Sequence, residues 1–152
     1  MNRVKTAVTA FFSALAGWLG ILAIPVLVLV ICNLIDYATG LAAAKYRNEP
    51  VSSYKGLRGI IKKVCMWLLI GVGAMVDWLI IYAGSTIGIT LPISFLIACI
   101  VAVWLIVNEI ISILENMVDI GVSIPPFLMP LVRNIKKQVE DKAGVKEGMT
   151  DE

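Results

Sequence analysis

The sequence predicts an all-α integral membrane protein, and three observations support this fold class. The 152 residues are 59% hydrophobic and only 16% charged, whereas soluble domains are roughly half apolar and a quarter charged. The mean hydropathy is +0.90. Apolar runs recur that reach the roughly twenty helical residues needed to cross a bilayer. We therefore expect three transmembrane helices, an additional N-terminal helix and a C-terminal amphipathic helix.

The first apolar stretch runs from Ala7 to Ala44, which exceeds one span and barely reaches two. Pro25 is the natural break, so we expect a first span over residues 25–44 and a separate helix within residues 1–24. Small residues recur there at three and four residue spacing, with aromatic and aliphatic residues elsewhere on the helix. This pattern favours an interfacial helix, and a fourth transmembrane helix is the alternative.

Two further spans are expected over residues 64–83 and 91–113, and together the spans form a membrane domain over residues 25–121. The loop between the second and third spans carries no charge, whereas the loop over residues 45–63 is basic. Under the positive-inside rule the basic loop is cytoplasmic, and three or four spans then leave the C-terminus cytoplasmic as well. The basic residues of this loop are Lys45, Arg47, Lys55, Arg58, Lys62 and Lys63.

The composition changes after Gly121, where two consecutive prolines precede a basic amphipathic stretch. Proline interrupts a helix, so we expect a break here. Residues 122–143 are predicted to form an amphipathic segment whose helix rests on the membrane surface. Residues 144–152 are polar and are expected to be a disordered tail.

Polar residues on the third apolar run form a stripe. At about 100° per residue they occupy an arc of roughly 120° on a helix. Lys55, Arg58 and Lys62 would share one face of a helix leading into the second span. The stripe therefore has three interpretations: an intramolecular clamp between the second and third helices, a surface that meets another subunit or lines water after assembly, or a solvated face. Its members are Asn108, Glu109, Ser112, Glu115, Asn116 and Asp119.

Two carboxyl groups, those of Asp36 and Asp77, lie inside predicted spans. No Lys or Arg lies within the spans to pair with either, and burial disfavours the charged form, so we expect both to be neutral. Each can hydrogen-bond a neighbouring helix of the same chain or of a second copy. A proton-carrying or pore-lining role is the sharper hypothesis. The stripes around them comprise Asn33, Asp36, Tyr37 and Gly40 on the first span, and Gly73 with Asp77 on the second.

The composition argues against catalysis and metal binding. The chain has no His, which removes the commonest metal ligand and the commonest general base. Cys32, Cys65 and Cys99 fall one to each apolar run, without the spacing of a zinc site. We therefore expect no enzyme, no catalytic residue, no metal, no cofactor and no nucleic-acid partner.

An ordered set of segments over about residues 18–130 resembles the phage lysis and toxin-secretion holins of the Cp-1 type. The resemblance implies a small protein of the bacterial cytoplasmic membrane that assembles with copies of itself in lipid. It then opens lesions that collapse the membrane potential and release an endolysin, or a toxin in relatives, which causes timed host lysis. The endolysin is a functional requirement without direct contact. The segments are Asp36-Tyr37-Ala38-Thr39-Gly40, a basic turn, Ser52-Ser53, Gly56-Leu57-Arg58-Gly59-Ile60-Ile61-Lys62-Lys63, Asp77, Asn108-Glu109, Ser112-Ile113-Leu114-Glu115-Asn116, Gly121 and Pro125.

Two other functions compete with this one. A small ion or proton channel is favoured by the intramembrane acids, but the chain has no His, no inverted repeat and no motif like a selectivity filter. A membrane adaptor would recruit a partner through the segment from Pro126 to Lys142.

Overall fold

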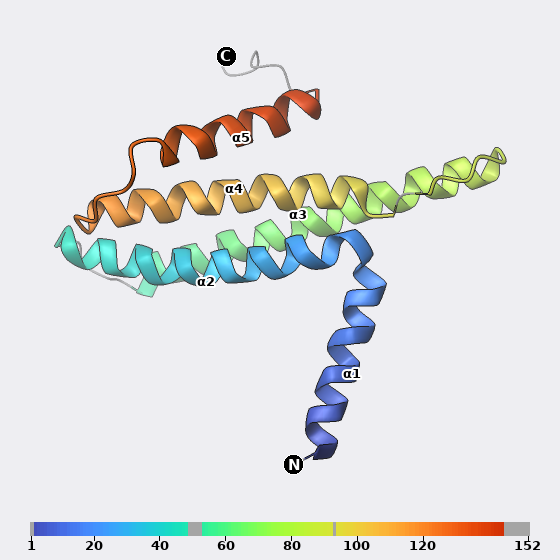
Figure 1. Cartoon of the computed structure of the whole chain (residues 1–152), viewed down its shortest axis with the longest axis horizontal. Helices are drawn as coiled ribbons and strands as arrows, with labels where there is room; N and C mark the ends of the chain where they lie inside the picture. The colour runs from blue at the N-terminus through green and yellow to red at the C-terminus, as the bar shows by residue number, and fades with distance from the viewer. Residues whose placement is uncertain (1, 49–52, 93, 145–152) are drawn as a thin grey trace.

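The computed structural model describes residues 2–48, 53–92 and 94–144, and the regular elements within them are all helices. The predicted all-α fold class is confirmed. Three helical stretches, residues 3–46, 56–86 and 96–119, are long and apolar enough to cross a membrane. The elements, shown in Figure 1, are α1 (Asn2–Leu19), the 3₁₀ turn η1 (Gly20–Leu22), α2 (Ala23–Tyr46), α3 (Ser53–Thr86), α4 (Leu96–Asp119) and α5 (Leu128–Lys142).

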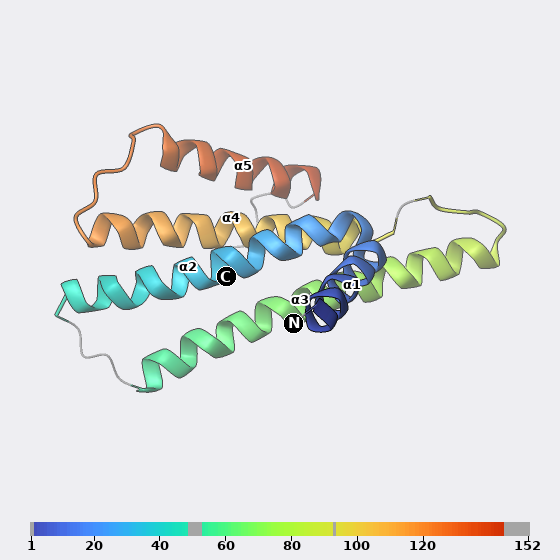
Figure 2. The same cartoon turned by 60° about the horizontal axis from the view of Figure 1, so that its bottom comes forward.

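Helix α4 is the centre of the bundle. It packs against α2, α3 and α5, whereas α2 and α3 make little direct contact with each other. Figures 1 and 2 show α2 and α5 running beside α4 in both views. Ala98 and Ala102 of α4 are fully buried, and small residues at a contact allow membrane helices to approach closely. Around them lies the main apolar cluster, which also includes Leu22, Leu29, Met66, Ile70 and Leu105.

The first long helical stretch bends at Gly20, not at Pro25 as the sequence predicts. Gly20 has a φ of +53°, which glycine adopts without the steric penalty of a Cβ. Pro25 instead lies in the first turn of α2, where its missing N–H would have had no partner within the helix. Beyond the bend, α1 leaves the bundle at a steep angle (Figure 1). It touches the rest of the chain where the Trp18 and Phe95 rings meet edge to face, with centroids 5.8 Å apart.

The second predicted span is part of a longer helix. We expected a span over residues 64–83 after a basic loop, but α3 begins at Ser53 and continues to Thr86. Much of the predicted loop is therefore helical, in agreement with the expected helix leading into the span. With 34 residues, α3 is about 51 Å long and extends beyond a hydrocarbon core of about 30 Å.

Helix α4 begins at Leu96, five residues after the predicted start of the third span at Leu91. Its N-cap residue, Phe95, has a left-handed backbone and makes no capping hydrogen bond through its side chain. The first-turn N–H groups of a helix have no intrahelical acceptors. Here the acceptor comes from another helix, because the Asp77 carboxyl of α3 accepts from Ile97 N at 2.8 Å and from Ala98 N at 2.9 Å.

Gly73 lies one turn before Asp77 on the same face of α3 and fits the same contact. A Cβ at Gly73 would lie 2.9 Å from Ala98 Cα and 3.1 Å from Ala98 N. Both atoms belong to backbone, which cannot move aside as a flexible side chain can. Gly73 and Asp77 therefore join α3 to the first turn of α4, one by close packing and the other by hydrogen bonding.

We predict that Gly73→Ala destabilises the bundle, because the added methyl group must push α3 away from α4. Overpacking of this kind costs about 1–3 kcal/mol. The measurement is the free energy of unfolding of the purified protein in detergent micelles, followed by circular dichroism. Gly71→Ala is the matched control, since nothing lies within 4 Å of a Cβ at Gly71. Equal stability of the two variants would contradict the prediction.

Candidate functional site: a buried charge cluster

Three helices each contribute one charged side chain to a single point inside the bundle. The Lys63 ammonium of α3 donates to Asp36 Oδ2 of α2 at 2.8 Å and to Glu109 Oε2 of α4 at 2.5 Å. Glu109 is only 1% exposed. We call Asp36, Lys63 and Glu109 the charge cluster.

The charge cluster lies deep in the bundle. Each member is ten residues from the end of its helix on the side where α2 and α4 finish and α3 begins. Figure 1 shows these three helix ends on the same side of the bundle. At about 1.5 Å per residue, that distance is about 15 Å. A bilayer has a hydrocarbon core of about 30 Å, so a bundle that spans it places the cluster close to the centre.

The Asn116 amide of α4 and the Thr39 hydroxyl of α2 extend the cluster between these two helices. Asn116 Nδ2 donates to Asp36 Oδ1 at 3.3 Å and to Thr39 Oγ1 at 3.2 Å. Gly40 allows this approach, because a Cβ there would already lie 3.5 Å from Asn116 Nδ2. The residues predicted as the stripe around Asp36 therefore meet part of the stripe on α4.

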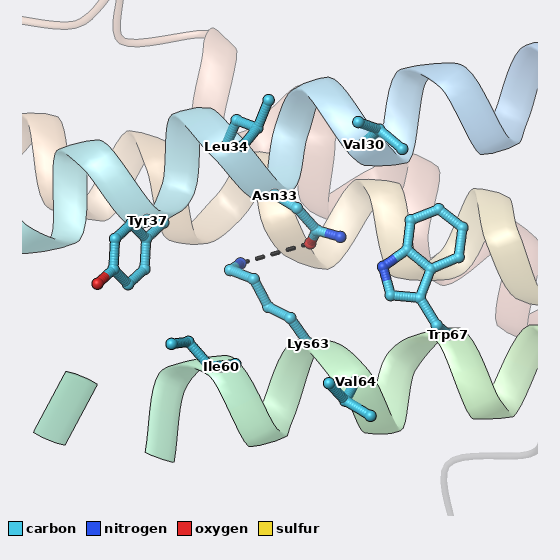
Figure 3. A pocket seen from close by; sticks show the side chains of 8 residues that line it. All are labelled: Val30, Asn33, Leu34, Tyr37, Ile60, Lys63, Val64 and Trp67. Carbon is cyan, nitrogen blue, oxygen red and sulfur yellow. Dashed lines mark hydrogen bonds between the residues drawn. The ribbon is translucent and has the colours of Figure 1, made fainter. Parts of the chain in front are cut away.

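The Asn33 amide links the cluster to Trp67 of α3. In the more favourable amide orientation, its nitrogen donates to Glu109 Oε2 at 3.0 Å and its oxygen accepts from Trp67 Nε1 at 3.3 Å. In the orientation drawn in Figure 3, the oxygen instead accepts from Lys63 Nζ at 3.4 Å. We prefer the first because it satisfies both ends of the amide, and the hydrogen-bond network is the basis for choosing between the two.

A groove of about 430 Å³ separates α2 from α3 beside the cluster. Figure 3 shows Lys63 extending across it from α3 toward Asn33. Val30, Leu34 and Tyr37 of α2 face it, so the predicted site residue Tyr37 lies on the wall of the groove and outside the charge cluster. The remaining wall is formed by Ile60, Val64 and Trp67 of α3.

The other acids of the predicted stripe point in different directions. Asp119 forms an ion pair with Arg47, which lies just past the end of α2. Glu115 faces α5 and lies 3.7 Å from Arg133. Asn108 Nδ2 donates to the Trp104 carbonyl of its own helix at 3.1 Å, and Ser112 is half-buried. The stripe is thus divided between α2, α3 and α5.

The intramolecular clamp predicted between the second and third helices exists, but through a different base. Lys45, Arg58 and Lys62 are all exposed. Arg58 and Lys62 form no ion pair within the described part of the chain. The side chain of Lys55 lies outside the described residues. The base that reaches the acids is Lys63, so the expectation that no Lys or Arg pairs with Asp36 is wrong.

A signal for Lys63 was present in the sequence. Lys63 precedes Trp67 by four residues and the buried Ile70 by seven, a spacing that puts all three on one face of a helix. That face points into the bundle. Lys63 lies just outside the apolar run, so the sequence assigns it to the basic loop and does not predict that its side chain points into the bundle.

The polar side chains of the charge cluster and its neighbours supply hydrogen-bond partners to one another. Among the described residues, no buried side-chain nitrogen or oxygen lacks a hydrogen-bond partner, and no group of His, Cys, Asp and Glu is placed to hold a metal ion. Buried polar groups that are fully paired fix a unique arrangement of the elements that carry them. The arrangement therefore holds three apolar helices together.

We predict that Lys63→Met strongly destabilises the bundle, because it leaves the buried Glu109 carboxylate and the half-buried Asp36 carboxylate without their cation. Removing one partner of a buried ion pair costs about 3–5 kcal/mol. The measurement is again unfolding in micelles, with the exposed neighbour variant Lys62→Met as the control. Adding Asp36→Asn and Glu109→Gln to Lys63→Met should restore most of the loss. A triple variant no more stable than the single one would contradict this explanation.

Comparison with known proteins identifies a family and relatives that match most of the chain. The model of the bacteriophage holin family matches residues 13–137. An uncharacterised protein of Clostridium perfringens is 31% identical over 137 residues, which cover 90% of either chain. An uncharacterised protein of Listeria monocytogenes is 34% identical over 122 residues, covering 80% of this chain and 79% of the relative. No solved structure matches the chain significantly. Because the family model spans most of its length, the chain belongs to the bacteriophage holin family.

Proposed function

We propose that the chain acts as a holin in the cytoplasmic membrane of a bacterium. Copies accumulate in the membrane, assemble with one another and open lesions that collapse the membrane potential. Through these lesions an endolysin, or in relatives a toxin, leaves the cytoplasm without binding the holin directly. The observation that carries this proposal is the holin family match over residues 13–137.

The bundle of α2, α3 and α4 supports harmless accumulation of dispersed copies. The charges of Asp36, Lys63 and Glu109 are paired inside the bundle, and most exposed residues in the middle of α2 and α3 are apolar. Such an apolar surface is compatible with surrounding lipid, so a dispersed copy does not draw water into the membrane. Exposed apolar residues on these faces include Leu27, Ile31, Leu34, Leu68, Val72 and Leu79.

Self-assembly then uses surfaces other than the charge cluster. The sequence left open whether Asp36, Asp77 and Glu109 bind helices of their own chain or of neighbouring copies. Each is engaged by its own chain. Lipid gives membrane helices no hydrophobic reason to associate, so contacts between copies depend on packing. The groove between α2 and α3 and the apolar faces beside it are the surfaces that we assign to this packing.

We place the end of the bundle at Tyr46 and Asp119 in the cytoplasm, as the positive-inside rule favours. We also place α1 in the outer interface, which gives three spans. The steep angle of α1 to the bundle supports this position (Figure 1). It also fits Trp18, which is 70% exposed near the bend, since tryptophan is enriched at membrane interfaces.

This topology predicts that a cysteine at Thr6 reacts with a membrane-impermeant maleimide added outside intact cells before lysis. Cys32, Cys65 and Cys99 are first replaced by Ala, and the reaction is read as a mass shift. A cysteine at Gln138 is the control and should stay unlabelled until the membrane is permeabilised. If the Thr6 site also requires permeabilisation, α1 is a fourth span.

The holin function predicts abrupt lysis that depends on an endolysin. The chain is expressed from a controlled promoter in bacteria with and without a cytoplasmic endolysin, and culture turbidity is followed. We expect sudden clearing after a delay only when the endolysin is present. The membrane potential should collapse at the same moment in both cultures.

Other outcomes would indicate the competing functions. Uniform single-channel conductance with no escape of a folded enzyme would identify a small ion or proton channel. Loss of function with assembly intact after deletion of residues 126–142 would favour an adaptor only if the variant chain still depolarised the membrane.

A further inference from the structure

Helix α5 packs along α4, which the sequence alone did not predict. The two helices run antiparallel and side by side in Figures 1 and 2. Val132 of α5 is buried with Val107 and Leu114 of α4 in a second apolar cluster, against which Leu128 and Met129 also pack. Helix α5 therefore covers a face of α4 that α2 and α3 leave open.

Polar contacts secure the far end of α5. Trp104 Nε1 donates to Glu140 Oε1 at 2.8 Å. The Lys136 ammonium lies 5.5 Å from the centroid of the Trp104 ring and 3.9 Å from Glu140 Oε1. A cation at this distance from the ring is attracted to its face. One tryptophan thus binds both a base and an acid of α5.

These contacts lie at the depth of the membrane. Trp104 is eight residues after the start of α4 and fifteen before its end, or about 12 Å and about 22 Å along the helix. When α4 crosses a hydrocarbon core of about 30 Å, Trp104 is inside that core. Lys136 and Glu140, which contact Trp104, are then at the same depth.

The outer face of docked α5 does not suit lipid. Charged side chains within the hydrocarbon are strongly disfavoured unless they face protein or water. The side of the molecule formed by α2 and α3 is the opposite in character, since its exposed residues are mostly apolar. The exposed polar residues on the outer face of α5 are Arg133, Asn134, Lys137, Gln138, Asp141 and Lys142.

We propose that α5, docked along α4, forms the water-facing wall of the lesion. Copies assemble with α5 toward a common lumen and with the apolar faces of α2 and α3 toward lipid and neighbouring copies. This inference rests on the proposed holin function and deepens it by naming the surface that meets water. The lumen is thus lined by α5, and the charge cluster stays closed.

The same argument gives α5 a second position in a dispersed copy. There, lipid surrounds α4, and α5 lies on the cytoplasmic surface, where its charges meet water and its apolar side meets the interface. Docking of α5 becomes favourable when assembly brings water to this face of α4. The movement of α5 therefore accompanies the change from dispersed copies to a lesion.

The test locks α5 in the docked position. In the chain with Cys32, Cys65 and Cys99 replaced by Ala, Val107→Cys and Val132→Cys are introduced and oxidised, and the protein is reconstituted in vesicles loaded with a fluorescent dextran. We expect the locked protein to assemble and release the dextran at least as well as its reduced form. Assembly without release in the locked form would overturn the proposal. Failure of the unmodified chain to release dextran would instead overturn the holin function.

A second measurement asks whether the outer face of α5 meets water. A spin label at Gln138→Cys in the locked protein should be relaxed by a water-soluble nickel complex, while a label at Leu68→Cys on α3 should be relaxed by oxygen dissolved in lipid. Replacing Arg133, Lys137 and Asp141 together by Leu should reduce dextran release at least tenfold. The conservative set Arg133→Lys, Lys137→Arg and Asp141→Glu should retain release. Oxygen relaxation at Gln138, or full release by the Leu variant, would overturn the proposal.

Discussion

The ion pairs of Lys63 with Asp36 and Glu109 are the interaction on which the rest of the bundle depends. Helices α2 and α3 pack mainly on α4 and little on each other, so the ammonium group of Lys63 is a direct link from α3 to both partners. Lipid does not drive apolar helices together. A half-buried cation that binds two acids from two other helices therefore favours one arrangement, because any other leaves a charge unpaired.

A second polar contact secures the opposite part of the bundle. Asp77 is fourteen residues beyond Lys63 on α3, or about 21 Å along the helix. Its carboxyl group binds the first turn of α4, while Gly73 keeps the two backbones close. Helix α4 is thus held to α3 at two levels. Between them lies the apolar packing of small and branched residues.

This closure within one copy changes the part that the intramembrane acids play in a holin. Because these acids already have partners in their own chain, a dispersed copy does not need to pair with a second copy through them. Exposed charged and polar groups lie elsewhere, on the outer face of α5. The molecule therefore separates two tasks: its polar interior maintains the bundle, and its polar exterior is where we place the contact with a lumen.

The sequence by itself determined the helical membrane fold, the approximate spans, and the acids and amides that matter. A polar residue within an apolar run is conspicuous whatever surrounds it, which is why Asp36, Asp77, Glu109 and Asn116 could be named in advance. Their partners could not, because a partner depends on which helix faces touch. Lys63 lay at the edge of a run, and the cap of α4 came from a residue twenty positions earlier.

Only the tertiary structure decided the start of α4 at Leu96, the bend at Gly20 and the docking of α5. An amphipathic helix buries its apolar side equally well on a bilayer or on another helix, so its periodicity cannot distinguish the two. A proline and a glycine both interrupt a helix, and the backbone conformation at each decides which one does. The residue types can be identified from the sequence, whereas the contacts between them depend on the tertiary structure.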